Sequence, residues 1–355
     1  MKVVAIGGGT GLATLLRGLK RYLVKPGHTV QLQPAISRLT AVVTVTDEGG
    51  SSGRLRREFR ILPPGDIRNC LVALAEDETL FTQLFNYRFT DGRGLRGHSF
   101  GNLFLTALAG LTSDFAQAVR VSGEVLAIRG EIFPATLSDV HLKARLRDGR
   151  TIEGESRINR TRVAVEQLYI VPDRCQPLPE TLAAIAQADL ITVGPGSLYT
   201  SLIPNVLVQG IPEQIERSRA LKVYVANLMT QPGETRRYTA SEHVRALHEH
   251  AGRKLFDFII LNTKLFSPSM RKRYAAQRAE PVVNDVDEIR ALGAEPVCAD
   301  LLGQGPVARH DFHRLAQLLL ELSARHQEIR GQAVSTSLES TSRNQQELKA
   351  GQAVV

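Results

Sequence analysis

Tryptophan is absent from this 355-residue sequence, and aromatic residues make up only 5% of it. These few aromatics form no stripe of the kind that stacks on RNA bases. Cysteine occurs three times, and Cys70, Cys175 and Cys298 lie too far apart to form a metal-binding pair or a disulfide framework. We therefore expect reduced thiols and no zinc, and nothing in the sequence suggests haem or flavin.

Long apolar runs are missing as well. No stretch approaches the roughly 20 consecutive apolar residues that span a bilayer, so we expect no membrane insertion. Met1 leads directly into KVVAIGG, which is typical of a first β-strand rather than of a signal peptide. Together with the isolated thiols, this predicts a cytoplasmic protein.

The charge is unbalanced toward the basic side. The formal net charge is +8, from 44 lysines and arginines against 36 acidic residues. This suits either a nucleic-acid-binding surface or a local site for a small polyanion. No zinc-finger spacing or basic tail supports nucleic-acid binding, whereas several arginines crowd one segment. We expect a phosphate site there, with solvated surface arginines as the alternative for most of them. The crowded arginines are Arg54, Arg56, Arg57, Arg60 and Arg68.

Apolar runs alternate with helical patterns along most of the chain, which indicates a parallel sheet covered by helices on both faces. The expected fold class is therefore α/β, a doubly wound, Rossmann-like and mostly parallel sheet. The expected strands are KVVAIGG, LTAVVTVT, LITVGPG, LKVYVANL, FDFIILN and EPVCADL.

One segment breaks this alternation. Residues 138–158 alternate apolar and polar side chains around Asp148-Gly149, a hairpin signal. We expect a small antiparallel β insertion at about 123–171 within a single α/β nucleotide-binding domain of residues 1–330. From Gly331 the sequence is polar and poor in large apolar residues, which predicts a disordered tail over 331–355.

The first glycine-rich loop, Gly7 to Gly11, follows an expected strand and opens a helix. Glycines let the backbone approach an anion there, and a helix N-terminus directs amide N–H groups and positive dipole toward it. No Lys-Ser/Thr pair follows, so the loop is not a P-loop. Leu12 occupies the last glycine position of G-x-G-x-x-G, which makes an NAD-dependent oxidoreductase a weaker alternative.

A second glycine-rich loop follows Asp47 and Glu48 at the end of another strand. Its amides and Arg54 are suited to phosphate, and Asp47 could ligate Mg²⁺ beside it. Asp66 stands at a helix start, where capping is an equal alternative. The loop also matches the G-x-S-x-G nucleophile elbow, with Asp300 and His310 as triad partners. Two carboxylates next to the serine argue against such a hydrolase.

Three further loops follow strands or precede helices and carry hydroxyl, amide or imidazole groups, each open to an explanation as turn chemistry. The candidate acids and bases are Asp47, Glu48, Asp66 and His98. The candidate nucleotide- and phosphate-binding residues are Gly8, Gly9, Thr10, Gly11, Gly50, Ser51, Ser52, Arg54, Asn102, Gly196, Ser197, Asn227 and Thr230.

Seven blocks occur in the order seen in the YvcK-type gluconeogenesis factors, relatives of the 2-phospho-L-lactate transferases. They are AIGGGTGL, TVTDEGGSSGRLR, PPGDIRNCL, HSFGNL, GPGSLYTSLIPN, NLMTQPGET and ARHD. The resemblance covers roughly residues 1–325. It implies a Rossmann-like sheet that binds a nucleotide diphosphate at the carboxyl ends of its strands.

The resemblance also implies a function. Members of the gluconeogenesis-factor branch bind UDP-sugars, notably UDP-N-acetylglucosamine, and support cell shape and envelope synthesis during gluconeogenic growth. By resemblance, Tyr274 and Arg309 contact the sugar nucleotide, and regulatory proteins of envelope synthesis are the expected partners. Whether the protein forms a homodimer stays open.

The transferase branch instead joins a phospholactyl-type group to a deazaflavin with Mg²⁺, and this is the alternative function. The family pattern has two aspartates where this chain has Asp47-Glu48. The glutamate weakens the case for a metal-dependent transferase more than the case for nucleotide binding. Whether the protein is an enzyme stays open.

Overall fold

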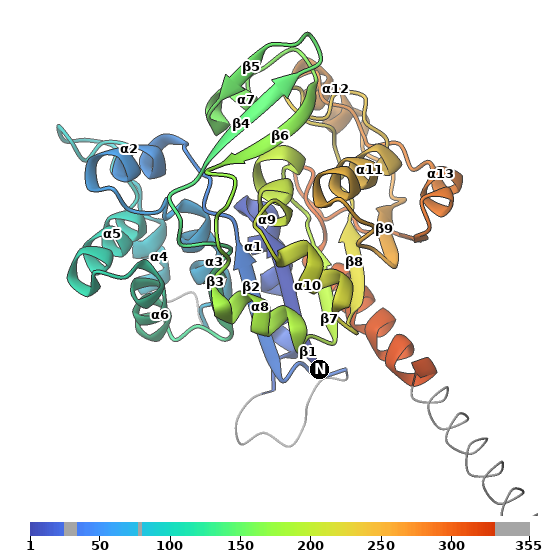
Figure 1. Cartoon of the computed structure of the whole chain (residues 1–355), viewed down its shortest axis with the longest axis horizontal. Coiled ribbons are helices and arrows are strands. Elements are labelled where there is room, and N and C mark those ends of the chain that lie inside the picture. Colours follow the sequence, from blue (N-terminus) through green and yellow to red (C-terminus); the bar gives the residue numbers. More distant parts are fainter. Residues whose placement is uncertain (25–33, 77–79, 331–355) are drawn as a thin grey trace, which may run out of the picture.

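A computed structural model describes residues 1–24, 34–76 and 80–330. Within them, seven strands form one sheet in the order β10-β9-β8-β7-β1-β2-β3, and every neighbouring pair is parallel. The expected doubly wound α/β fold is confirmed (Figure 1). The strands are β1 (Lys2–Gly7), β2 (Arg38–Val43), β3 (Glu131–Pro134), β7 (Leu190–Val193), β8 (Leu221–Val225), β9 (Phe258–Asn262) and β10 (Glu295–Ala299).

The direction of winding reverses between β1 and β7. From β1 the chain builds outward through β2 and β3, and it later returns to the other side of β1 with β7 before continuing to β10. Loops that leave two such strands diverge toward opposite faces of the sheet, which opens a crevice beyond their carboxyl ends. The fold thus places the loops after β1 and β7 next to each other.

Alternate side chains of each strand enter two separate cores. On β1, Val3 and Ala5 pack with the α1 side of the sheet, whereas Val4 and Ile6 pack with the opposite side. This is the two-residue period of a strand buried on both faces.

The helices are α1 (Gly9–Leu19), α2 (Gly50–Phe59), α3 (Gly65–Leu74), α4 (Leu80–Asn86), α5 (Phe100–Thr112), α6 (Phe115–Val125), α8 (Pro179–Ala186), α9 (Ile203–Val206), α10 (Ile211–Arg217), α11 (Ala240–Ala251), α12 (Pro268–Ala276), α13 (Val286–Ala291) and residues 312–330, with one-turn helices η1 (Lys20–Tyr22) and η2 (Leu198–Leu202).

The antiparallel insertion is a three-stranded sheet in the order β5-β4-β6. It consists of β4 (His141–Leu146), β5 (Thr151–Glu153), the short helix α7 (Glu155–Ile158) and β6 (Val165–Val171). In Figure 1 it lies at the end of the molecule opposite to the N-terminus, beyond the carboxyl ends of the parallel strands. Residues 123–134, which we expected inside the insertion, instead complete α6 and supply β3 to the large sheet.

Two further expectations concern the C-terminal tail and membrane-spanning helices. The expected disordered tail, 331–355, lies outside the described residues. Among the described helices, none is both long enough and apolar enough to cross a bilayer.

Candidate functional site

A cavity of about 430 Å³ lies at the carboxyl ends of β1, β7 and β8. The loops after these three strands form most of its wall, and residues of α12 and of the segment 308–310 complete it. It occupies the crevice where a doubly wound sheet binds its ligand. Among the described residues that line it, there is no aspartate or glutamate.

The first wall is the start of α1. Gly8 is the residue before the helix, and the amide of Gly9 donates to the carboxylate of Asp66. No acidic residue belongs to the first turn of α1 itself, so Asp66 of α3 is the acid that meets this helix end. Thr10 and Gly11, whose amides also lie in the first turn, line the cavity, where amides and helix dipole favour an anion. Gly11 is required because a Cβ there would lie 2.2 Å from the carbonyl oxygen of Pro195. The loops after β1 and β7 therefore touch through their backbones.

The second wall is the loop after β7, and a buried glutamate holds it. Glu234, which is 2% exposed, comes from the loop after β8. Its Oε2 accepts from the amide of Tyr199 at 2.9 Å, and its Oε1 accepts from Thr200 Oγ1 at 3.1 Å and from the Ser197 hydroxyl. Burial raises the pKa of Glu234, while these hydrogen bonds oppose that rise. One carboxylate thus ties two walls of the cavity together.

The third wall carries an arginine on a braced segment. The hydroxyl of Tyr274 accepts from the amide of Ala308 at 3.0 Å, and Arg273 donates to the carbonyl of Pro306. Both bonds fix the segment that ends in Arg309. Within the described residues, the guanidinium of Arg309 has no hydrogen bond or ion pair, so it is available to a ligand in the cavity.

His310 adjoins Arg309 and is buried. Burial lowers the pKa of its imidazole to about 4. The ring is therefore neutral near neutral pH and brings no charge to the cavity.

An acidic cluster lies beside the cavity, behind the start of α1. Burial and the charge of Asp47 raise the pKa of Asp66 to about 7. Burial, followed by the same charge, also raises the pKa of Glu155. Glu155 belongs to the insertion, and it pairs with Glu48 through reciprocal bonds: each carboxylate accepts from the other residue's amide, at 2.8 and 3.1 Å. The carboxylate of Glu48 therefore contacts the insertion.

Residues 3–302 of the sequence match the family described as 2-phospho-L-lactate transferase CofD. The chain is 45% identical over 322 residues to the gluconeogenesis factor of Bacillus subtilis, which covers 90% of this chain and 98% of that protein. It is 44% identical over 320 residues to the gluconeogenesis factor of Halalkalibacterium halodurans, with 90% and 95% covered. The chain belongs to the gluconeogenesis factors of the 2-phospho-L-lactate transferase family.

A solved structure agrees with this assignment. The X-ray structure of a Bacillus halodurans protein, 44% identical, superposes with a TM-score of 0.84 and covers 90% of this chain and 99% of its own. The expected family and the Rossmann-like fold are thereby confirmed.

The cavity brings together one group of the residues predicted for this family's ligand, and leaves another outside. Its lining includes Gly8, Gly9, Thr10, Gly11, Gly196, Ser197, Asn227, Thr230, Tyr274 and Arg309. The predicted residues that do not line it are Asp47, Glu48, Gly50, Ser51, Ser52, Arg54, Asp66, His98 and Asn102.

The second glycine-rich loop is not a wall of the cavity because it continues directly into α2. Ser51 is buried, and its hydroxyl bonds Nδ1 of His98 at 2.9 Å and accepts from Asn102 Nδ2 at 3.1 Å. The hydrolase alternative had paired Ser51 with His310, but His310 lines the cavity and Ser51 does not. The serine is instead part of the packing between α2 and α5.

Most of the crowded arginines bond to the protein itself. Arg54 donates to the carbonyl of Arg96 at 2.8 Å, and Arg56 donates to Asp139 at 2.6 Å. Arg68 donates to Asn69 Oδ1 at 2.7 Å. These bonds explain the cluster as support for the loops around α2 and α3. The sequence did not single out Glu234 or Glu155, whose partners lie far away in the chain.

The described residues contain no group of three histidine, cysteine, aspartate or glutamate side chains arranged to hold a metal ion. Asp47 and Asp66 are nevertheless close enough for the charge of one to raise the pKa of the other. Two carboxylates of this kind suit Mg²⁺, which commonly takes one or two protein carboxylates and completes its shell with water and substrate phosphates.

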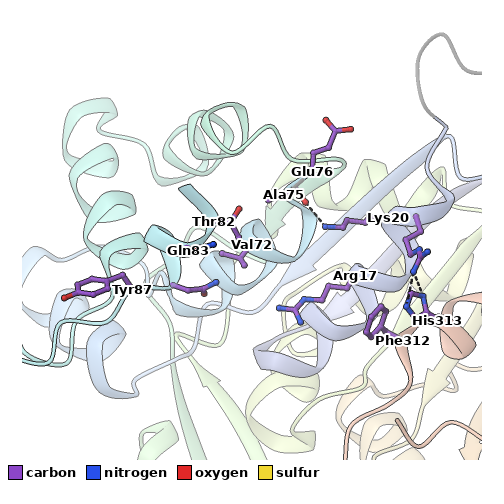
Figure 2. Close-up of a pocket in the computed structure, with 12 residues that line it drawn as sticks. Arg17, Lys20, Val72, Ala75, Glu76, Thr82, Gln83, Tyr87, Phe312 and His313 are labelled. Carbon is purple, nitrogen blue, oxygen red and sulfur yellow. Dashed lines mark hydrogen bonds between the residues drawn. The ribbon is translucent and has the colours of Figure 1, made fainter. Parts of the chain in front are cut away.

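A larger cavity of about 740 Å³ lies between the end of α1, residues of α3 and α4, and residues 312–313 (Figure 2). Two of its cations are already bonded: Lys20 Nζ donates to the carbonyl of Ala75 at 2.6 Å, and Arg21 contacts Nδ1 of His313 at 2.8 Å. It lies away from the glycine-rich loops, so we place the ligand site in the smaller cavity.

Replacing Asp66 tests the electrostatics of the acidic cluster. Its folded-state pKa, about 7, exceeds the ordinary value of 3.8. The protonated form therefore stabilises the fold below about pH 4, and this contribution is lost as pH rises through about 7. Asp66→Asn does not titrate, so we expect its stability relative to wild type to increase by about 1–3 kcal/mol between pH 5 and pH 8.

The measurement is urea unfolding across this pH range in the presence of a chelator. Asp173→Asn, at an exposed position with no hydrogen bond or ion pair among the described residues, is the control and should show no such trend. Parallel pH profiles for Asp66→Asn and wild type would contradict the assigned pKa.

Proposed function

We propose that this protein binds a UDP-sugar, with UDP-N-acetylglucosamine as the first ligand to test, in the cavity at the carboxyl ends of β1, β7 and β8. The observation that carries the proposal is the convergence of the first turn of α1, the Gly196–Ser197 loop and Arg309, which has no bonded partner among the described residues, on one cavity. Amides and a guanidinium are the groups that bind a diphosphate. Asn227 and Thr230 add neutral polar groups suited to a sugar or a base.

The proposed role is regulatory binding without turnover. In the part of the chain that the structure describes, the cavity lining offers hydrogen-bond donors but no carboxylate to act as a general base or nucleophile. The names of its relatives support a role in gluconeogenic growth. We propose that the ligand-bound protein acts in the cytoplasm and reports sugar-nucleotide supply to a protein partner in envelope synthesis, and so affects cell shape.

Replacing Arg309 tests the proposed diphosphate contact. We expect Arg309→Gln to raise the Kd for UDP-N-acetylglucosamine about tenfold or more, because a charge-assisted pair with phosphate is lost. Isothermal titration calorimetry provides the measurement. Arg174→Gln, which removes an exposed arginine with no bonded partner among the described residues, should bind like wild type. Equal affinity of Arg309→Gln and wild type would remove Arg309 from the site.

A Mg²⁺-dependent phospholactyl-type transferase is the second candidate. Asp66, which lies against Gly8, and Asp47, which is close enough for its charge to raise the pKa of Asp66, favour it because they would hold the cation. When bound, Mg²⁺ would offset negative charge on the phosphates of the donor substrate. Incubation with a deazaflavin acceptor and an activated donor should then give product that Asp47→Asn fails to form. Absence of product from the wild-type protein would leave the binding role.

A further inference from the structure

Next to the 430 Å³ cavity of the candidate site, here called the first cavity, lies a smaller one of about 230 Å³, here called the second cavity. Three arginines line the second cavity. Arg162 comes from the loop between α7 and β6 of the insertion, and Arg236 and Arg237 come from the loop that precedes α11. Pro232 lines both cavities, which places them side by side. Nothing in the proposed sugar-nucleotide contact uses these arginines.

The three arginines of this second cavity are not paired with an acidic side chain of the described residues. Within the described ranges, Arg162, Arg236 and Arg237 make no hydrogen bond or ion pair. Glu234 is the acid among the residues that line the cavity, and its carboxylate is buried in bonds to the loop after β7. Residues 157–164 and 235–238 together hold five arginines and no acid. A concave surface with one sign of charge concentrates small anions.

The loop of the insertion is held in place by contacts within it and with its neighbour. Thr161 Oγ1 donates to the carbonyl of Val163 at 3.1 Å and accepts from the amide of the same residue at 3.2 Å. A Cβ on Gly233 would lie 2.0 Å from the carbonyl oxygen of Asn159, so the two arginine-bearing loops touch through their backbones. This contact holds the backbones of the two arginine-bearing loops against each other.

The loop before α11 is equally restrained. The amide of Gln231 donates to Thr235 Oγ1 at 2.9 Å, and the amide of Thr235 donates back to the carbonyl of Gln231 at 2.8 Å. Arg237 has a φ of 63°, a left-handed conformation that few non-glycine residues adopt. Because the backbones on both sides are fixed, the arginines lose less freedom on binding a ligand than they would on mobile loops.

We propose that Arg162, Arg236 and Arg237 form a binding site for a phosphate-bearing small molecule. Guanidinium groups match phosphate through paired N–H donors, and a cavity of about 230 Å³ suits a small anion better than the face of a macromolecule. The phosphate can belong to a separate metabolite or to a ligand that extends past Pro232 from the first cavity. In the first case the site does not depend on which ligand the first cavity takes, and in the second case it rests on the proposed sugar-nucleotide site.

Calorimetric titration with inorganic phosphate tests this site in the full-length protein. Three proteins are compared, all carrying Arg309→Gln to weaken phosphate binding in the first cavity. The first has no other change, the second adds Arg162→Gln, Arg236→Gln and Arg237→Gln, and the third adds Arg93→Gln, Arg174→Gln and Arg325→Gln. The third has the same charge as the second but loses only exposed arginines elsewhere that have no bonded partner among the described residues.

We expect the second protein to bind phosphate at least about tenfold more weakly than the first, because charge-assisted bonds are lost. The third should differ from the first by less than about twofold, since it loses only surface charge. Equal weakening in the second and third proteins, or no saturable binding by the first, would overturn the proposal.

A second titration, with UDP-N-acetylglucosamine, distinguishes the two sources of phosphate and uses proteins that retain Arg309. Weaker binding in the Arg162, Arg236 and Arg237 variant assigns the site to a ligand that spans both cavities. Unchanged binding of the sugar nucleotide, together with weaker phosphate binding, assigns it to a separate metabolite.

Discussion

Glu234→Ala is expected to lower the free energy of unfolding by about 3–5 kcal/mol, the largest effect of any single substitution considered for the cavity. The substitution leaves the amide of Tyr199 and the hydroxyls of Ser197 and Thr200 without their buried acceptor. It also leaves a void where a side chain that is 2% exposed had packed. Urea unfolding at neutral pH measures the change.

The same substitution is expected to abolish ligand binding, because the loop after β7 loses the anchor that holds it against the loop after β8. Glu234→Gln keeps the shape and one carbonyl acceptor, so it should remain folded and bind UDP-N-acetylglucosamine at least about tenfold more weakly. Glu328→Ala, at an exposed position of the helix 312–330, is the control and should change stability by less than about 0.5 kcal/mol. A loss below about 1 kcal/mol in Glu234→Ala would contradict the role assigned to this carboxylate.

Gly11→Ala is expected to separate the two loops that form the cavity. Its Cβ would lie 2.2 Å from the carbonyl oxygen of Pro195, and because both partners are backbone the contact cannot be relieved by a rotamer change. We expect a loss of about 2–3 kcal/mol in stability, in the range of overpacked cores, together with loss of sugar-nucleotide binding. Thermal unfolding and calorimetry provide the two measurements.

Gly110→Ala is a matched control for which we expect the opposite change in stability. Gly110 lies inside α5, and a Cβ there would meet nothing within 4 Å. Alanine should therefore stabilise the protein by about 0.5–1 kcal/mol through its higher helix propensity. If Gly11→Ala behaved like Gly110→Ala, the close approach of the two loops would be wrong.

The sequence predicted six of the seven parallel strands because each is an apolar run bounded by turn residues. It missed β3, Glu131–Pro134, which has only four residues and ends in proline. This strand is defined by parallel pairing with Thr40–Val43, some 90 residues earlier in the chain. Such distant pairing leaves no periodicity in a short segment, so we had assigned these residues to the antiparallel insertion.

For the candidate site, local backbone demands could be predicted and distant side-chain partners could not. Gly9 and Gly11 stand out in the sequence because a turn between strand and helix needs them. The same reasoning predicted a second phosphate-binding loop at Gly50 to Gly53. In the structure, α2 begins at Gly50, and Gly53 is needed because a Cβ there would lie 2.1 Å from the carbonyl oxygen of Glu48. Glu234 is hidden in the sequence because its acceptor role depends on residues 34–37 positions away.

A crystal structure of the protein grown with UDP-N-acetylglucosamine would show directly whether the ligand binds at the carboxyl ends of β1, β7 and β8. We expect the diphosphate to lie within hydrogen-bond distance of the amides at the start of α1, with Arg309 paired to it and Ser197 beside it. A ligand bound in the larger cavity near Arg17 and Phe312, or elsewhere on the surface with the first cavity unchanged, would contradict this expectation.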